Sequence, residues 1–228
     1  MNQELPQYTI NRLCIRVGEA AWLSRFSNTS QHYSAMRRTI MNVEKANLVD
    51  KCLIATPAIK DPLFASSLVY ICEHSENGSM GLVVNHQTTQ TLGDIFIQLD
   101  IECDDEMIKQ KPVFIGGPVQ LEQGFVLHTT AHDWQKTVEI SSGIYLTSSL
   151  DVLEAIAINE GPEDYLVILG FSGWASGQLE SELQQNSWLT SSSGTELLFH
   201  KNSDDKWQMA FDTLGFDISM LSPVSGNA

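Results

Sequence analysis

Basic side chains are scarce in this sequence: 13 Lys and Arg residues stand against 28 Asp and Glu residues, for a formal net charge of −15. The scarcity is greatest after residue 40, where 8 basic residues face 26 acidic ones, a net charge of −18. Residues 1–40 differ, with five arginines and two glutamates, a net charge of +3. Because nucleic-acid affinity comes largely from Lys and Arg that neutralise phosphates, we expect no direct binding of nucleic acid by the acidic part.

Long apolar runs are also missing. No stretch approaches the ~18 apolar residues that a membrane-spanning helix needs, and the apolar content of 43% is ordinary for a globular protein. The sequence therefore predicts a protein without a membrane-spanning helix and without a membrane partner.

Motifs for metals and reactive thiols are absent as well. The chain has four cysteines, Cys14, Cys52, Cys72 and Cys103, with no C-x-x-C pair and no His/Cys cluster at zinc spacing. Cys52 and Cys72 lie in apolar runs, which is typical of buried thiols in a reducing compartment. His128 and His132 have a spacing that suits a metal site on a helix, but their region predicts strand and loop. No metal or other cofactor is expected.

Residues 1–40 have no long periodic pattern and few acids, a composition shared with organelle transit peptides. We favour a different interpretation, in which translation starts at Met36 or Met41 and residues 1–40 are a poorly ordered extension. A short helix over residues 17–26 is the only element expected there. Residues 41–228 would then form one body.

Turn and cap signals divide that body into short elements. Residues 68–74 and 80–85 predict a hairpin around Asn77-Gly78, and Thr91 caps a helix that runs to about Leu99. Residues 102–106 predict a solvated acidic loop. Further strands are expected at residues 48–59, 112–115 with 125–128 as its hairpin partner, 138–140, 144–147 and 197–199, and further helices at residues 149–158 and 204–214. This order predicts an α+β fold, with a mixed, largely antiparallel sheet and several flanking helices in a compact single body.

The stretch of residues 166–183 stands out. An apolar run over residues 166–169 breaks at Gly170, and apolar residues at helical spacing follow from Leu179. We expect a buried strand, a glycine turn over residues 170–177 that carries Trp174, and a helix. The glycine spacing matches no phosphate-binding loop and no nucleophile elbow. The simplest interpretation is that glycine lets a helix and a strand approach closely, and it predicts that Gly177→Val destabilises the whole fold.

Polar groups at strand ends are the candidates for chemistry. Glu73 and His74 precede the hairpin turn, and His128 ends another strand. Neighbouring strand residues point to opposite faces, so Glu73 and His74 share a site only if the hairpin bulges. An acid–base pair requires His74 to meet His128 or Glu180. The alternative is that these groups are hydrogen-bonded for structural reasons.

Two glycine turns, Gly116-Gly117 and the segment from Gly173 to Gly177, are candidates for binding. If they converge, their backbone N–H groups and the Trp174 indole would suit a flat or anionic ligand, with Gln178 and Glu180 beside it. Packing of Trp174 in the core is the competing interpretation.

Ordered motifs carry a resemblance to a known family. They are Asp61-Pro62 with Phe64, residues 67–74, Gly78-x-Met80-Gly81-Leu-Val-Val-Asn85, Phe114-Ile-Gly-Gly-Pro-Val119, Gly124-Phe-Val-Leu-His128, residues 170–180, and Asn186-Ser-Trp188-Leu. In these blocks the chain resembles the bacterial AlgH/YqgE family from about Met41 to its end. Two places depart from the family pattern, Asn85-His86-Gln87 and Phe171-Ser172, and the first puts the shape of its loop in question.

The resemblance implies an α+β protein of the bacterial cytosol without an established activity. One member is named as a regulator of alginate synthesis genes, and the acidic body implies that any role in transcriptional regulation is indirect. Two function classes stay open. The first, which we favour, is a non-enzymatic protein that binds an unknown small ligand or protein partner, with Asn85 among the binding residues. The second is a hydrolase or transferase that uses His74, His128 and Glu180.

Overall fold

Ten strands and six helices make up the part of the chain that the structure describes, a computed structural model in which residues 47–200 and 202–215 are placed. The strands are β1 (Lys51–Ala55), β2 (Leu68–Ser75), β3 (Gly78–Val83), β4 (Gln87–Thr91), β5 (Pro112–Ile115), β6 (Val119–His128), β7 (Thr137–Ser141), β8 (Ile144–Thr147), β9 (Tyr165–Ala175) and β10 (Trp188–Ser192). The helices are α2 (Leu92–Leu99), α3 (Glu106–Lys109), α4 (Asp151–Ala157), α5 (Gln178–Gln184), α6 (Thr195–Leu198) and α7 (Ser203–Asp212). The predictions for residues 1–40 lie outside the described residues.

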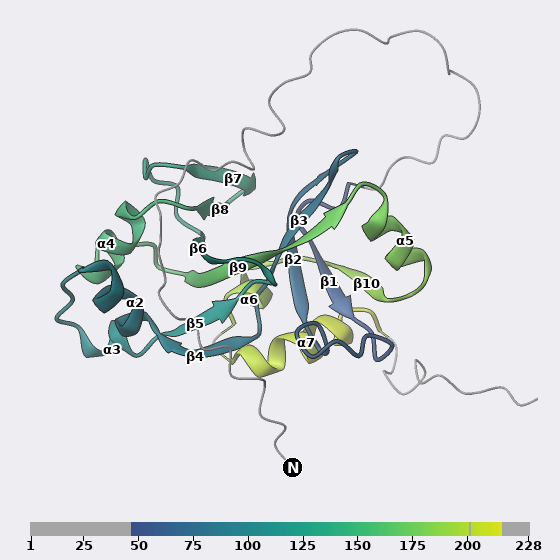
Figure 1. Cartoon of the computed structure of the whole chain (residues 1–228), viewed down its shortest axis with the longest axis horizontal. Helices are drawn as coiled ribbons and strands as arrows, with labels where there is room; N and C mark the ends of the chain where they lie inside the picture. The colour runs from purple at the N-terminus through teal and green to yellow at the C-terminus, as the bar shows by residue number, and fades with distance from the viewer. Residues whose placement is uncertain (1–46, 201, 216–228) are drawn as a thin grey trace, which may run out of the picture.

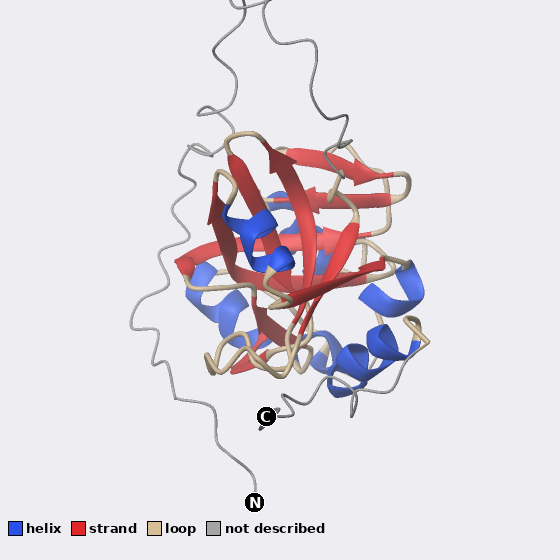
Figure 2. Ribbon diagram, turned by 90° about the vertical axis from the view of Figure 1, so that its right-hand side faces the viewer, coloured by secondary structure: helices blue, strands red, loops and turns tan. Residues whose placement is uncertain are grey.

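The sheet is largely antiparallel and curled, with helices around it (Figures 1 and 2), which confirms the predicted α+β class. Its strand order is β10-β1-β2-β3-β9-β6-β8-β7, and β4 and β5 form a branch beside β9. The only parallel pair among the described strands joins β5 to β9. No helix of the described part is long and apolar enough to cross a bilayer.

Elements with strong local signals form where the sequence predicts them. The hairpin of β2 and β3 turns at Asn77, and β7 and β8 form the second predicted hairpin. Thr91 caps α2 in a capping box, because its side chain accepts the Asp94 N–H while the Asp94 carboxylate accepts the Thr91 N–H. Trp207 and Phe211 of α7 pack on the same core cluster as Leu214, which follows the helix, as the helical spacing indicates.

Strand β9 continues through the predicted glycine turn, so the turn expected over residues 170–177 is wrong. Its first half pairs with β5 and β6, and its second half pairs with β3. The change of neighbour occurs at Gly170, which has φ +68°, a backbone angle that glycine adopts without strain. Pairing with β3 gives residues 172–175 ladder partners that a free turn would lack, so the chain turns only at Ser176-Gly177.

Three other predictions need correction. Residues 125–128 are not the hairpin partner of β5, because β9 lies between β5 and β6. Residues 197–199 fall mostly in the short helix α6 instead of a strand, since Leu197 and Leu198 are both buried against the same cluster. The acidic loop is shorter than expected, because the Asp105 carboxylate caps α3.

The core has three clusters of buried side chains that surround the sheet. The first involves α6 and α7, the second α2, α3 and α4, and the third α5. Residues 166–169 of β9 alternate between the first two clusters, with Leu166 and Ile168 on one side and Val167 and Leu169 on the other. Both faces of this half-strand are therefore covered, which is why its sequence is uniformly apolar.

Candidate functional site

A β-bulge in β2 decides where the candidate residues Glu73 and His74 point. Ile71 and Glu73 pair with consecutive residues of β3, so Cys72 is one extra residue in the strand. Glu73 pairs with Met80, which belongs with Cys72 to the first core cluster, and cross-strand partners share a face. His74 therefore points to the opposite face, where α5 lies.

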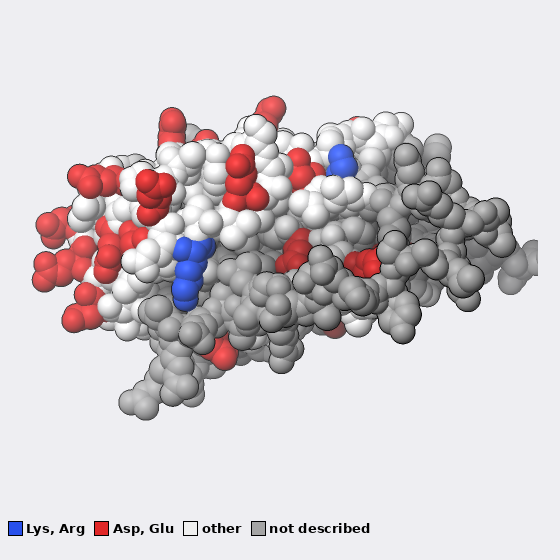
Figure 3. Space-filling view, turned by 90° about the horizontal axis from the view of Figure 1, so that it is seen from above, with Lys and Arg blue, Asp and Glu red and all other residues white. Residues whose placement is uncertain are grey.

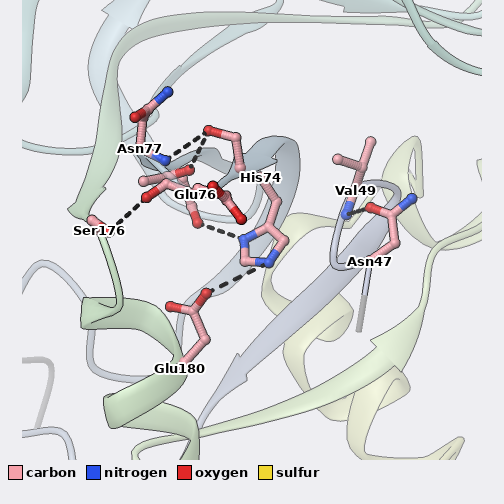
Figure 4. A network of polar contacts seen from close by, with 10 residues as sticks. Asn47, Val49, His74, Glu76, Asn77, Ser176 and Glu180 are labelled. Carbon is pink, nitrogen blue, oxygen red and sulfur yellow. Dashed lines mark hydrogen bonds and ion pairs between the residues drawn. The ribbon is translucent and has the colours of Figure 1, made fainter. Parts of the chain in front are cut away.

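The bulge brings His74 to Glu180, as Figure 4 shows. His74 Nε2 lies 3.7 Å from Glu180 Oε1, and Nδ1 lies 2.8 Å from the Oγ of Ser79, the residue opposite in β3. When Nδ1 accepts the Ser79 hydroxyl proton, Nε2 carries a proton toward the carboxylate. The His74 side chain is 10% exposed and that of Glu180 is 44% exposed. We call His74, Ser79 and Glu180 the hairpin cluster.

Hydrogen bonds hold the segments around the hairpin cluster in place. Ser176 donates its hydroxyl to the carbonyl of Glu76 at 2.5 Å, which ties the turn after β9 to the hairpin tip (Figure 4). Gln178 accepts the Ala175 N–H at 3.0 Å through Oε1. This bond closes the turn between β9 and α5, and Gly177 offers the helix no side-chain cap. Partial burial raises the pKa of Glu73, which lies on the other face.

Trp174 packs in the core instead of offering an indole face to a ligand. It is buried at 7% exposure and meets Trp188 edge to face at 6.1 Å. Its indole N–H and that of Trp188 both donate to Oε2 of Glu182, at 2.9 and 2.8 Å, and Gln178 donates to the other oxygen. Sequence reasoning missed Glu182, because no local pattern links an acid in α5 to two tryptophans in separate strands.

The glycine turns do not open a cleft between them. A Cβ on Gly116 would lie 2.4 Å from the Gly170 carbonyl oxygen, and the Gly116 N–H already donates to Leu169 at 2.8 Å. Gly117 is equally close to Phe171. These glycines allow backbones to cross in contact, which agrees with the structural interpretation.

Gly173 and Gly177 lie elsewhere, at the exposed end of β9. A Cβ on Gly173 would meet only ordinary contacts, the nearest at 3.5 Å, and one on Gly177 would meet nothing within 4 Å. The steric reason for a severe effect of Gly177→Val is therefore wrong, and only the positive φ of +73° disfavours a side chain there.

Asn85 is occupied by the fold. Its Oδ1 accepts the Leu68 N–H at 2.8 Å and its Nδ2 donates to the Ser66 carbonyl at 2.9 Å, and the residue is 7% exposed. This amide holds the loop before β2 against the end of β3.

We expect Asn85→Leu to lower the free energy of unfolding by roughly 1–3 kcal/mol, because it leaves the buried Leu68 N–H without a partner and removes the bond to the Ser66 carbonyl. Urea denaturation measures the change. Asn77→Leu, at the exposed hairpin turn, is the control and should change stability by less than about 1 kcal/mol. Similar losses in the two variants would contradict this role of Asn85.

His128 is far from the hairpin cluster. It pairs with Tyr165 at the start of β9, whereas Ser79 pairs with Trp174 near its end, which separates them by roughly 30 Å of strand. His128 is fully buried, its Nε2 lies 2.8 Å from Thr147 Oγ1, and burial lowers its pKa to about 4. The structure thus brings His74 and Glu180 together and leaves His128 apart. No group of three metal-ligating side chains occurs among the described residues.

Comparison with known proteins agrees with the sequence motifs. The profile of the family described as AlgH-like matches residues 52–219. The chain belongs to the AlgH-like family. UPF0301 proteins of Xanthomonas campestris pv. campestris and Xanthomonas axonopodis pv. citri are 45% and 46% identical over 188 residues, covering 82% of this chain and 100% of each relative.

Two solved structures show the same fold. The solution structure of the AlgH protein from Pseudomonas aeruginosa matches with a TM-score of 0.67 and 36% identity, covering 85% of this chain and 100% of that one. The crystal structure of protein DIP2367 from Corynebacterium diphtheriae matches with a TM-score of 0.62, 82% coverage of this chain and 94% of that one. At 18% identity, the second match concerns the fold alone.

Proposed function

We propose that this AlgH-like protein is a non-enzymatic binding protein of the cytoplasm that recognises a small ligand or protein partner at the hairpin cluster. The observation that carries the proposal is the meeting of His74 and Glu180, which come from elements more than a hundred residues apart. A half-exposed carboxylate beside a nearly buried imidazole offers a hydrogen-bond acceptor in a fixed position. The cluster suits a ligand that donates a hydrogen bond or carries a positive charge to Glu180.

The surface charge supports recognition of something other than nucleic acid. Acidic side chains crowd one end of the molecule, where only a few basic residues are visible (Figure 3), in keeping with the −18 charge of residues 41–228. Such a surface repels phosphate backbones. Any influence on transcription therefore passes through a protein or a small ligand.

A hydrolase is the second candidate, and one observation favours it. Ser79, His74 and Glu180 follow one another in the order hydroxyl, imidazole, carboxylate, which is the order that activates a serine nucleophile. A hydrolase mechanism that also uses His128 would need a substrate that spans roughly 30 Å, the length of strand between His128 and the hairpin cluster. Ser79 itself lies within a strand paired on both sides, which leaves little room for an acyl group.

A thermal-shift screen of a metabolite library against the full chain tests the binding proposal, since a ligand of the folded state raises the melting temperature. We expect compounds that stabilise the wild type and lose their effect in Glu180→Gln. The control Glu196→Gln, which changes an exposed acid of α6, should keep the effect. The parallel arm is capture of a protein partner that Glu180→Gln no longer retains.

Two results would contradict the proposal. The first is that ligands and partners bind Glu180→Gln as well as the wild type. The second is covalent labelling of Ser79 by a fluorophosphonate probe, lost in His74→Gln, because a non-enzymatic protein has no activated serine.

A further inference from the structure

A hollow of about 680 Å³ lies at the opposite end of β9 from the hairpin cluster. Its walls come from the loop after β6 and from the hairpin of β7 and β8, which Figure 1 shows on the side of the molecule away from α5. The side chains that matter for its chemistry are His132, Asp133, Trp134, Thr137, Glu139 and Tyr145. Its volume falls in the range of small-molecule sites.

Two aromatic walls of the hollow are steeply inclined to each other. The His128 ring, buried behind them, is nearly perpendicular to Trp134, with an interplanar angle of 84° and centroids 5.1 Å apart. The same ring is nearly parallel to Tyr145, at 19° and 5.7 Å. Trp134 and Tyr145 must therefore be far from parallel. His132 stacks on Trp134 at 4.4 Å and covers one face of this indole, which is 8% exposed, so Tyr145 is the more open ring.

The carboxylates that line the hollow give it a negative charge. Asp133 and Glu139 line it and are both exposed, and no Lys or Arg is among the described residues that line it. Aromatic faces carry negative partial charge, so walls and rim both favour a cation.

The interior behind the walls is fixed and neutral. His128 bonds to Thr147, whose hydroxyl lies 2.6 Å from that of Thr137, a lining residue. Because burial lowers the pKa of His128 to about 4, its imidazole is uncharged near neutral pH and does not repel a cation.

We propose that this hollow binds a compact organic ammonium cation, with a methylated ammonium group against the Tyr145 ring, beside the His132–Trp134 stack, and with the carboxylates of Asp133 and Glu139 at the rim. Methyl groups spread the charge over a surface that fits aromatic walls and is weakly hydrated, so little hydration is lost on binding. The site shares no residue with the hairpin cluster, and it stands or falls independently of the proposed function.

Titration of the full chain with choline, followed by NMR or calorimetry, tests the proposal. We expect saturable binding in the millimolar range, and at least tenfold weaker binding of 3,3-dimethyl-1-butanol, the neutral isostere in which carbon replaces nitrogen. Tyr145→Leu should abolish binding and Glu139→Gln should weaken it several-fold. Glu196→Gln, which changes an exposed acid of α6 that does not line the hollow, should leave it unchanged.

The comparison of isosteres keeps the test decisive even if a variant folds poorly, because it uses the wild-type protein. Equal binding of choline and its neutral isostere would overturn the proposal, as would the failure of choline, tetramethylammonium and trimethyllysine to bind. Choline binding that Tyr145→Leu and Glu139→Gln leave intact would place the cation elsewhere and overturn it too.

Discussion

Replacing Gly117 with alanine is expected to lower the free energy of unfolding by about 3–5 kcal/mol, the sum of a packing clash and backbone strain. A Cβ at this position would lie 2.4 Å from the carbonyl carbon and oxygen of Phe171 and from the Oγ of Ser172. The Phe171 backbone is held in β9 by its pairing with Val119, so it cannot easily move away. The φ of +151° adds strain for any residue with a side chain.

The matched control is Gly177→Ala. Gly177 also has a positive φ, +73°, but a Cβ there meets no atom within 4 Å. Urea denaturation of both variants separates the two costs, and we expect Gly177→Ala to lose only about 1 kcal/mol. Equal losses would show that the backbone angle alone matters and that the crossing at Gly117 tolerates a methyl group.

The stability of the wild type relative to Lys206→Met is expected to rise by up to about 3 kcal/mol between pH 8 and pH 10.5. Lys206 in α7 is fully buried, and its ammonium group donates to the carbonyls of Val84 at 2.9 Å and Leu198 at 2.6 Å. No salt bridge to a carboxylate accompanies them among the described residues. Burial therefore lowers the pKa of Lys206 from 10.5 to about 8.

The direction of this stability change depends on whether the folded or the unfolded state binds the proton of Lys206. Between these two pKa values the unfolded chain keeps a proton that the folded protein has released, so stability increases with pH. Below pH 8 both states are charged and the contribution is constant. Burial also raises the pKa of the nearby Cys52 thiol to about 12, which acts in the opposite direction. Because the thiol is present in both proteins, their difference in stability reports Lys206.

Urea denaturation of the two proteins at several pH values between about 7 and 10.5 measures this difference. Parallel stability curves would show that the ammonium group is fully solvated or paired in a way that offsets its burial. Lys51→Met, which removes an exposed lysine at the start of β1, is the control and should give curves parallel to the wild type.

The sequence was most informative where structure depends on neighbours in the chain. The Asn77-Gly78 turn, the Thr91 cap with Asp94 and the apolar face of α7 all formed as predicted. The burial of Cys52 and Cys72 followed from the apolar runs that contain them. Dihedral preferences, side-chain caps and periodicity act over a few residues, so their signals can be read locally.

Strand partners were harder to predict. Nothing in residues 112–128 shows that β9, some fifty residues later, lies between β5 and β6. In the sequence, Gly170 indicates the end of a strand. In the structure it lies within β9, at the point where the partners of this strand change from β5 and β6 to β3. The pairing of distant strands depends on which apolar faces can be covered at the same time, and that is a property of the whole chain.

For the candidate sites too, the sequence determined some features and the tertiary structure decided the others. The sequence determined the charge of the body, the absence of zinc-finger and phosphate-loop motifs, and His74, Glu180 and His128 as polar groups for consideration. Only the tertiary structure decided that the extra residue Cys72 turns His74 toward Glu180. It also decided that Glu182 joins two tryptophans and that Trp134 and Tyr145 meet around a hollow. The physical reason is that a one-residue bulge reverses which face each following side chain occupies, and its cause lies in packing across the sheet rather than in the local sequence.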